Sequence, residues 1–366
     1  MSFTTFNRNK FDFMAQPMFF GESPNVARFD QQKHEKFEKL TTKQLAFFWR
    51  PEEVIIQRDA QDFRELEDHE RHIFLSNLKY QTLLDSVQGR SPVAVLLPIC
   101  SDPALENWIE TWSFSETIHS RSYTHIMRNV LPNPSEVLDD IMCNEHIMRR
   151  AEAVTDLYDQ LYQMNLRKDM GLPVDEYAHA RLLYLCMHSI NALEAIRFYV
   201  SFACSFSFAE RGIMEGNANI IELIARDESL HMSGTQYILR EMQRGNEGDL
   251  MARVAEDTRE EAESIFLEAS AQEKEWAEYL FQYGAMLGLN KDILNQYVDY
   301  LTDHRMRAAG LRSPFEGVKL KNPISWVNKY LNTSDVQKTP QEKETGQYLS
   351  GQMDTSISTD DFNFDL

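Results

Sequence analysis

Paired carboxylate and imidazole side chains recur along the chain at a spacing that suits metal binding. Residues three positions apart lie on one face of an α-helix, so a glutamate and a histidine at this spacing can hold the same ion. Such pairs also arise by chance in a glutamate-rich chain, so the surrounding sequence must identify the functional ones. The Glu-x-x-His pattern occurs at three places: Glu116/His119, Glu176/His179 and Glu228/His231.

Two of these pairs follow a further carboxylate on a preceding expected helix. Asp85 in NLKYQTLLDS precedes Glu116 by 31 residues, and Glu194 in NALEAIRFYVSF precedes Glu228 by 34. Ferritin-like di-metal bundles take one inward carboxylate from each of two helices and a Glu-x-x-His pair from each of two others. This internal repetition predicts a dinuclear metal site with six ligands: Asp85, Glu116, His119, Glu194, Glu228 and His231.

The third pair has a different setting. Glu145 precedes Glu176 by 31 residues, but the pair lies in the polar sequence DEYAHAR at an expected helix start. Glu194, in contrast, begins a stripe of phenylalanines at fourfold spacing, where a carboxylate is costly unless it is protonated or paired with a cation. We therefore expect Glu176 and His179 to be solvent-exposed and outside the metal site.

The donor set favours hard divalent cations. Four carboxylates and two imidazoles suit iron or manganese in pairs, and the chain has no cysteines at the spacing of a structural zinc site. Asp227, next to Glu228, and Trp112 are expected to hydrogen-bond to ligands. The alternative stays open that the six residues bind no metal and are instead charges on helix surfaces and hydrogen-bonded polar groups of the core.

Tyr123 follows His119 by four residues and Glu116 by seven, so all three lie on one helical face. Such a tyrosine is either a simple core residue or, beside a dioxygen-activating cluster, an oxidisable phenol. Phe198, Phe202 and Ile224 are expected to line a pocket around it, and such a wall excludes water and quenching reductants.

The elements that must position these residues are helices. The chain has 366 residues, 43% of them hydrophobic and 26% charged, with only 14 glycines and 12 prolines and little of the alternation typical of strands. Asp102 with Pro103 predicts a helix start. We expect an all-α, ferritin-like bundle with long helices at about 68–86, 103–131, 180–210, 216–244 and 249–283.

The composition also excludes several classes of partner. Lys and Arg total 37 against 57 Asp and Glu, and this net charge of −20 disfavours nucleic acid and anionic membranes. No uninterrupted apolar stretch approaches the ~20 residues of a spanning helix, and the N-terminus lacks a secretory signal. The four cysteines lack metal-site spacing and are expected to be buried, reduced thiols. We expect a soluble, cytoplasmic protein.

The last 35 residues differ in composition from the rest. Residues 1–331 are expected to form the helical domain, whereas residues 332–366 lose apolar periodicity and cannot repay the entropy of ordering. This tail nevertheless contains Tyr348 and ends in the apolar and acidic sequence FNFDL. It is either a solubilising tail or a segment that docks on a partner.

At these residues the chain closely resembles the small, radical-generating subunit of class I ribonucleotide reductase, most like the class Ia form. The resemblance runs nearly from end to end. It is carried by FFWRPEE at 47–53, NLKYQTLLDS at 77–86, ETWSFSETIHSRSYTHI at 110–126, NALEAIRFYVSFACSF at 191–206, ARDESLH at 225–231 and GLNKDIL at 288–294.

The resemblance implies two iron ions per subunit, oxygen-bridged, or manganese in related proteins. Asp85, Glu116 and His119 would hold one ion and Glu194, Glu228 and His231 the other. It further implies that dioxygen reacts with the reduced metals and that Tyr123 becomes a stable radical. The family's small subunits are homodimers.

The resemblance also implies a partner and a route to it. The radical reaches the large subunit, which reduces nucleoside diphosphates to deoxynucleoside diphosphates with thioredoxin or glutaredoxin as reductant. The inner part of the route would be Trp49, Asp227 and His119. Tyr348 would be a relay in the tail, with Glu342 in proton management, and the tail would dock on the large subunit.

Two competing hypotheses use the same architecture. Another ferritin-like di-metal oxidase, such as a fatty-acyl desaturase or a hydroxylase component, would need a substrate channel to the metals. An iron-storage bundle would have no use for Tyr348 on an acidic tail. The blandest alternative, a metal-free helical scaffold, would bind no metal tightly.

Overall fold

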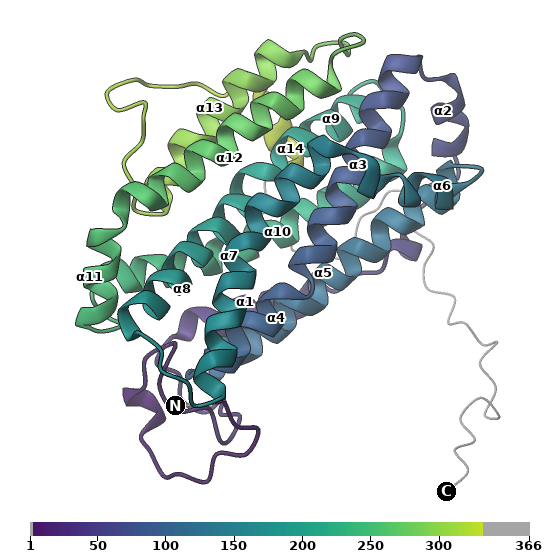
Figure 1. Ribbon diagram of the computed structural model, residues 1–366. Helices are drawn as coiled ribbons and strands as arrows, with labels where there is room; N and C mark the ends of the chain where they lie inside the picture. The colour runs from purple at the N-terminus through teal and green to yellow at the C-terminus, as the bar shows by residue number, and fades with distance from the viewer. Residues whose placement is uncertain (1–2, 332–366) are drawn as a thin grey trace, which may run out of the picture.

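Long helices run roughly along one axis and form a bundle (Figure 1). The structure is a computed structural model that describes residues 3–331, and within this range it contains helices and two isolated bridges but no strand. The all-α bundle is therefore confirmed. The central helices are α3 (Asp68–Gln88), α5 (Pro103–Val130), α8 (Glu176–Ala192), α9 (Tyr199–Ala209) and α10 (Glu215–Gln243).

Helix α5 shows how local signals set an element. The Asp102 side chain accepts a hydrogen bond from the backbone N–H of Leu105, and Pro103 occupies the first turn, where a missing N–H costs nothing. The helix ends before Pro132 after 28 residues, as predicted. At 1.5 Å per residue it is about 42 Å long, so it can carry several functional side chains on its buried face.

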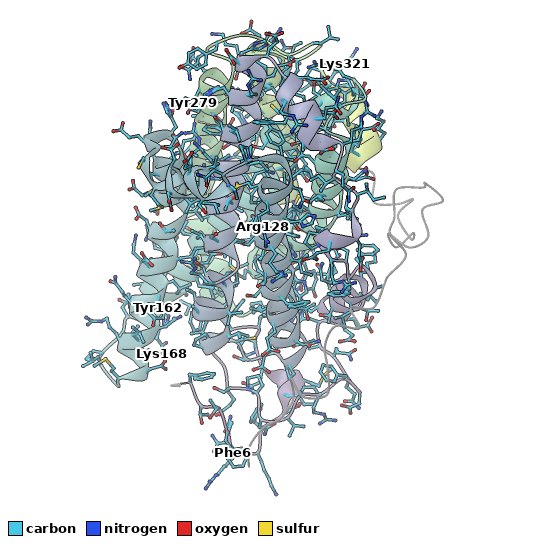
Figure 2. All side chains as sticks on the ribbon, turned by 90° about the vertical axis from the view of Figure 1, so that its right-hand side faces the viewer. Phe6, Arg128, Tyr162, Lys168, Tyr279 and Lys321 are labelled. Carbon is cyan, nitrogen blue, oxygen red and sulfur yellow. The ribbon has the colours of Figure 1, made fainter. Side chains whose placement is uncertain are left out.

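Outer helices complete the bundle. Helix α1 packs on α5, α7 on α8, and α12 on α13. The N-terminal segment lies at one end of the bundle, where Phe6 is far from Tyr279 and Lys321 at the other end (Figure 2). The outer helices are α1 (Glu35–Ala46), α2 (Asp59–Glu65), α4 (Ser91–Leu96), α6 (Pro134–Asp139), α7 (Glu145–Asp169), α11 (Asp249–Asp257), α12 (Arg259–Leu280), α13 (Lys291–Ala308) and α14 (Asn328–Leu331).

The expected continuous helix over 180–210 is interrupted. A π-helical segment, Leu193–Arg197, separates α8 from α9 and carries Glu194. Glu176–Ala209 taken together is long and apolar enough to cross a membrane by length and composition, but 94% of its most apolar window is buried inside the protein. Its apolar character is thus accounted for by its position in the core.

Two further expectations are corrected. The helix expected over 249–283 is two helices, because the chain leaves helical geometry at Thr258, whose φ is −107° and ψ is 15°. Cys100, Cys186 and Cys204 are buried as expected, but Cys143 is exposed, since it lies in a short turn between α6 and α7. No disulfide forms among the four.

The start of α10 is fixed by α2. The Asp59 carboxylate accepts hydrogen bonds from the backbone N–H groups of Gly216 and Asn217, at 3.1 and 2.6 Å. Gly216 is required there, because a Cβ would lie 2.7 Å from the carbonyl oxygen of Ile55. This cap sets the register of the helix that carries Glu228 and His231.

Candidate metal centre

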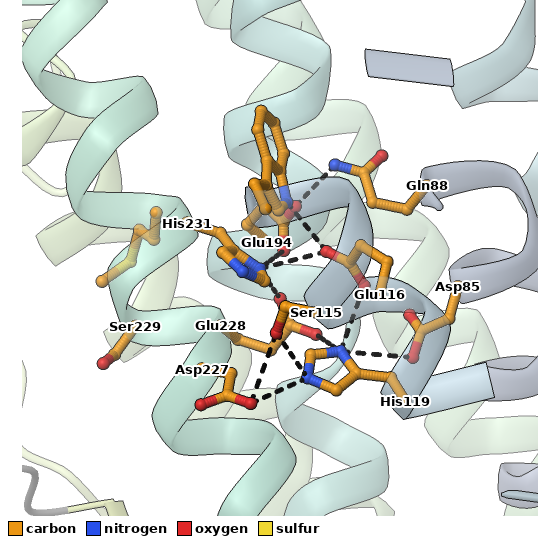
Figure 3. Close-up of polar contacts among 12 residues, drawn as sticks. Asp85, Gln88, Ser115, Glu116, His119, Glu194, Asp227, Glu228, Ser229 and His231 are labelled. Atoms are coloured by element: carbon orange, nitrogen blue, oxygen red, sulfur yellow. Dashed lines mark hydrogen bonds and ion pairs between the residues drawn. The ribbon is translucent and has the colours of Figure 1, made fainter. Parts of the chain in front are cut away.

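Four helical segments bring the six predicted ligands together in the middle of the bundle. Each of the six side chains is fully buried. They form two groups whose ligand atoms lie within 4.8 Å of one another, and Glu116 and Glu228 belong to both groups. Figure 3 shows the ligands converging from their helices: Asp85 from α3, Glu116 and His119 from α5, Glu194 from the π segment, and Glu228 and His231 from α10.

The two histidines face the same two carboxylates. His119 Nδ1 lies 3.1 Å from one oxygen of Glu116 and 3.1 Å from one oxygen of Glu228. His231 Nδ1 lies 3.0 and 3.1 Å from the other oxygens of the same two residues. Glu116 and Glu228 therefore each present one oxygen to either half of the site, which is the arrangement of bridging ligands.

The remaining two carboxylates lie at the two ends. Asp85 lies 3.9 Å from His119 Nδ1, and Glu194 lies 4.0 Å from His231 Nδ1. Each belongs to one group only. Both oxygens of Asp85 and Oε2 of Glu194 are buried without any hydrogen-bond partner. Buried carboxylate oxygens of this kind require a compensating partner, and a metal ion would provide one.

The buried carboxylates of the cluster would be stabilised by cations. Burial raises the pKa values of Asp85 and Glu194 well above their usual range, and the neighbouring carboxylates add to both shifts. Burial alone would lower the pKa of His231, but Glu116 and Glu228 outweigh it and raise the pKa to about 9. Four buried carboxylates carry a charge that two divalent cations would balance. The donor set thus fits a dinuclear metal site.

Surrounding donors orient the ligands. Trp112 donates its indole N–H to Glu116 over 2.8 Å, as expected, and Gln88 donates to Glu194 over 2.5 Å. His119 directs its second ring nitrogen, Nε2, toward Asp227 at 3.3 Å. Such partners fix the tautomer of a histidine and the rotation of a carboxylate before a metal arrives.

Trp49 joins the centre through Asp227. Its indole N–H donates to Asp227 Oδ2 over 2.8 Å, and the same oxygen faces His119. Trp49 is 1% exposed. The adjacent Ser115 hydroxyl accepts from Gln44 over 3.0 Å and lies 3.4 Å from Asp227. A continuous series of polar contacts thus runs from the buried indole of Trp49 through Asp227 to the predicted ligand His119.

Tyr123 is fully buried and its hydroxyl has no hydrogen-bond partner. Burial raises the pKa of this phenol well above its usual range, and the nearby Asp85 carboxylate adds to the shift. Phe198 and Phe202 are also fully buried and stack with ring centroids 5.8 Å apart, and Ile224 is fully buried on α10. The phenol therefore stays neutral in its buried environment.

The third Glu-x-x-His pair lies outside the centre, but the expectation that both its members are exposed is wrong. Glu176 is exposed, whereas His179 is 2% exposed and its Nε2 lies 2.7 Å from the amide oxygen of Asn165. Burial lowers the pKa of His179 to about 4. It is a neutral core residue that links α8 to α7.

Sequence reasoning missed part of the surroundings. Gln88 follows Asp85 by three residues and so shares its helical face, a signal that could have been read. Gln44 and Tyr158, the latter hydrogen-bonded to Gln88 over 2.9 Å, belong to outer helices whose packing no local pattern reveals. Tyr348 and Glu342 lie outside the described residues.

Comparisons with known proteins agree with this architecture. Residues 27–323 match the family model described as ribonucleotide reductase, small chain. The chain is 54% identical over 378 aligned positions to ribonucleoside-diphosphate reductase 1 subunit beta of Escherichia coli O157:H7, and the alignment covers all of both chains.

Two solved structures share the fold. The ribonucleotide reductase R2 subunit from Clostridium botulinum superposes with a TM-score of 0.76 at 24% identity, covering 90% of this chain and 98% of that one. The dimanganese(II)-NrdF of Streptococcus sanguinis gives a TM-score of 0.65 at 18% identity, covering 85% and 100%. On the family model and the full-length identity, the chain belongs to the small-chain family of ribonucleotide reductases.

Proposed function

We propose that this chain is the radical-generating small subunit of a ribonucleoside-diphosphate reductase and that Tyr123 is its radical site. The observation that carries the proposal is a buried phenol without a hydrogen-bond partner beside two overlapping groups of metal ligands. The six predicted ligands would hold a pair of reduced iron ions, which would supply two of the four electrons that reduce dioxygen to water; Tyr123 would supply the third and an external one-electron reductant the fourth.

The residues around Tyr123 determine what its oxidation yields. Loss of one electron from a phenol is accompanied by loss of its proton, and Asp85 is the carboxylate with the strongest electrostatic influence on this hydroxyl. Phe198, Phe202 and Ile224 offer neither protons nor easily removed electrons. Their burial supports a long-lived tyrosyl radical, because water and reductants are kept away.

The exit route for the radical is proposed to begin at His119, Asp227 and Trp49. Their polar contacts support this assignment, since Trp49 is the aromatic group hydrogen-bonded to the centre through Asp227. Tyr348 and Glu342 are proposed to continue the route in residues 332–366, which would dock on the large subunit. The small subunit is proposed to act as a homodimer in the cytoplasm, and the pair of subunits to reduce nucleoside diphosphates.

Iron is the proposed metal. The oxygen-rich donor set suits iron and manganese equally, and the streptococcal protein named above is a dimanganese form. The resemblance to the class Ia form is what favours iron here. Manganese remains the alternative that metal analysis of the purified protein distinguishes.

A cavity of about 890 Å³ argues against a desaturase or hydroxylase of apolar substrates. It reaches Asp85, but its walls carry Arg90, Arg121 and Arg128 together with serine and threonine side chains. A hydrocarbon chain would gain little from burial against charged groups. Dioxygen, being small, needs no such apolar channel.

Electron paramagnetic resonance of apoprotein given ferrous iron and then air tests the proposal. A signal near the free-electron position that disappears in Tyr123→Phe is the expected result. Iron oxidation without a radical in either protein would instead support an oxidase or storage function. Absence of iron binding would contradict the ligand assignment itself.

A further inference from the structure

A second buried tyrosine is linked to the metal centre through a single amide. The Tyr158 hydroxyl on α7 donates to Gln88 Oε1 over 2.9 Å, and Gln88 Nε2 donates to Glu194 Oε1 over 2.5 Å. Gln88 and Glu194 are fully buried, and Tyr158 is 2% exposed. The two hydrogen bonds that connect the tyrosine, the amide and the carboxylate are therefore buried, where a lost hydrogen bond is hard to replace.

The tyrosine fixes which way the amide points. In the observed orientation the amide oxygen of Gln88 accepts a hydrogen bond from the Tyr158 hydroxyl, and the amide N–H donates to the carboxylate of Glu194. A flipped Gln88 would turn its oxygen toward that carboxylate and leave the phenol proton without the acceptor it has now. Both changes are unfavourable in a buried site, because an unsatisfied or repelling polar group cannot turn to water.

The amide in turn fixes which oxygen of Glu194 is free. Oε1 is held by Gln88, whereas Oε2 has no hydrogen-bond partner and points toward the ligand group, 4.0 Å from His231 Nδ1. Glu194 needs such an anchor because it lies in the π segment, where the backbone departs from regular α-helical geometry. Asp85, at the opposite end of the centre, has no donor on either oxygen.

We propose that Tyr158 is a positioning residue of the metal centre, which acts through Gln88 to present Glu194 Oε2 to the metal ion. Tyr158 hydrogen-bonds to Gln88 rather than to a predicted ligand or to Tyr123, so it is assigned no direct part in oxidation. The inference rests on the proposed function only in requiring that Glu194 is a metal ligand. It adds a residue of α7, a helix that supplies no ligand, to the parts that determine metal affinity.

Titration of the full-length apoprotein with Mn²⁺ under anaerobic conditions tests the proposal without any radical chemistry. Free Mn²⁺ is quantified by its electron paramagnetic resonance signal. Tyr158→Phe, which removes only the hydroxyl, and Gln88→Met, which removes the donor at similar volume, are each expected to weaken binding of one Mn²⁺ by about tenfold. The other Mn²⁺ is expected to be less affected.

The double variant distinguishes positioning from general loss of stability. Since Tyr158 acts through Gln88, Tyr158→Phe is expected to change Mn²⁺ affinity little in the Gln88→Met background. Tyr184→Phe is the matched control: Tyr184 is also buried, but its hydroxyl hydrogen-bonds to Gln243, away from the ligands. This control is expected to lower the urea midpoint of unfolding without weakening Mn²⁺ binding.

Each outcome has a distinct meaning. Wild-type affinity in a folded Tyr158→Phe protein, or additive effects in the double variant, would overturn the positioning role while leaving the proposed function intact. Failure of the wild-type protein to bind Mn²⁺ or Fe²⁺ would overturn the proposed function instead. If Tyr158→Phe does not fold, full Mn²⁺ affinity of a folded Gln88→Met protein is the result that contradicts the proposal.

Discussion

Trp49 and Asp227 are joined by a 2.8 Å hydrogen bond from the indole nitrogen to a carboxylate oxygen, although 178 residues separate them in the chain. The bond links the segment after α1 to α10, next to the predicted ligand Glu228. Because both groups are buried, neither can exchange this partner for water.

Replacement of Trp49 by phenylalanine is therefore expected to interrupt the proposed radical-transfer route at Asp227. Reductase activity with the large subunit is expected to fall at least 100-fold, because phenylalanine neither oxidises readily nor bonds to Asp227. The bound metal, measured by elemental analysis, is expected to stay at two ions per chain. Loss of metal together with activity would mean that Trp49 acts on the structure of the site rather than on transfer.

The shared ligands make a separate prediction about stoichiometry. Glu228→Ala removes a carboxylate that belongs to both ligand groups, so we expect it to reduce Mn²⁺ binding in both halves of the site. Asp85→Ala alters one group only and is expected to leave one ion bound. Equilibrium dialysis against Mn²⁺ measures both values, and equal losses in the two variants would contradict the bridging arrangement.

The contact between α5 and α10 can be tested at a glycine. A Cβ on Gly234 would lie 2.2 Å from the ring of Trp108, so Gly234→Ala forces two packed helices apart. We expect it to lower the free energy of unfolding by about 1–3 kcal/mol, the usual cost of overpacking. Ser233→Ala, one position away and half-buried, is the control for helix propensity. Equal urea midpoints for the two variants would show that the helices accommodate the added methyl group.

The Asp59 cap predicts a dependence on pH. Burial raises the pKa of Asp59 to about 6 from an ordinary value of 3.8, so between these values the folded protein binds more protons than the unfolded chain. The contribution of this residue to stability therefore falls as the pH rises from about 4 to 6. Asp59→Asn leaves one acceptor oxygen for two N–H groups and is expected to lower the free energy of unfolding by about 1–3 kcal/mol.

Denaturation of both proteins at several pH values checks this sign. The difference in the free energy of unfolding between wild type and Asp59→Asn is expected to narrow as the pH rises through that range. A difference that widens with pH would mean that the two N–H donors, rather than burial, dominate the ionisation of Asp59.

Features written in local sequence were predictable. Asp102 and Pro103 mark the start of α5, and the Glu-x-x-His spacing places Glu116 beside His119, because both depend on helical geometry alone. The convergence of the six predicted ligands was predictable for the same reason, through the repetition of their spacing on two pairs of helical segments.

Features that depend on packing between helices were not predictable. The π segment has the same apolar pattern as a regular buried helix, so nothing local distinguishes it. His179 was expected at the surface because its neighbours in sequence are polar, yet α7 supplies Asn165 across the helix pair. Tyr158 escaped notice because its partner Gln88 lies 70 residues away.

The π segment also bears on how this site could arise and be lost. A π-turn accommodates one residue more than an α-turn, so deleting a single residue from Leu193–Arg197 would restore regular helix and rotate α9 by about 100° relative to α8. Glu194 and the phenylalanines after it would then no longer face the same interior. An insertion or deletion in this segment is therefore expected to disturb the site more than a side-chain substitution of similar size would.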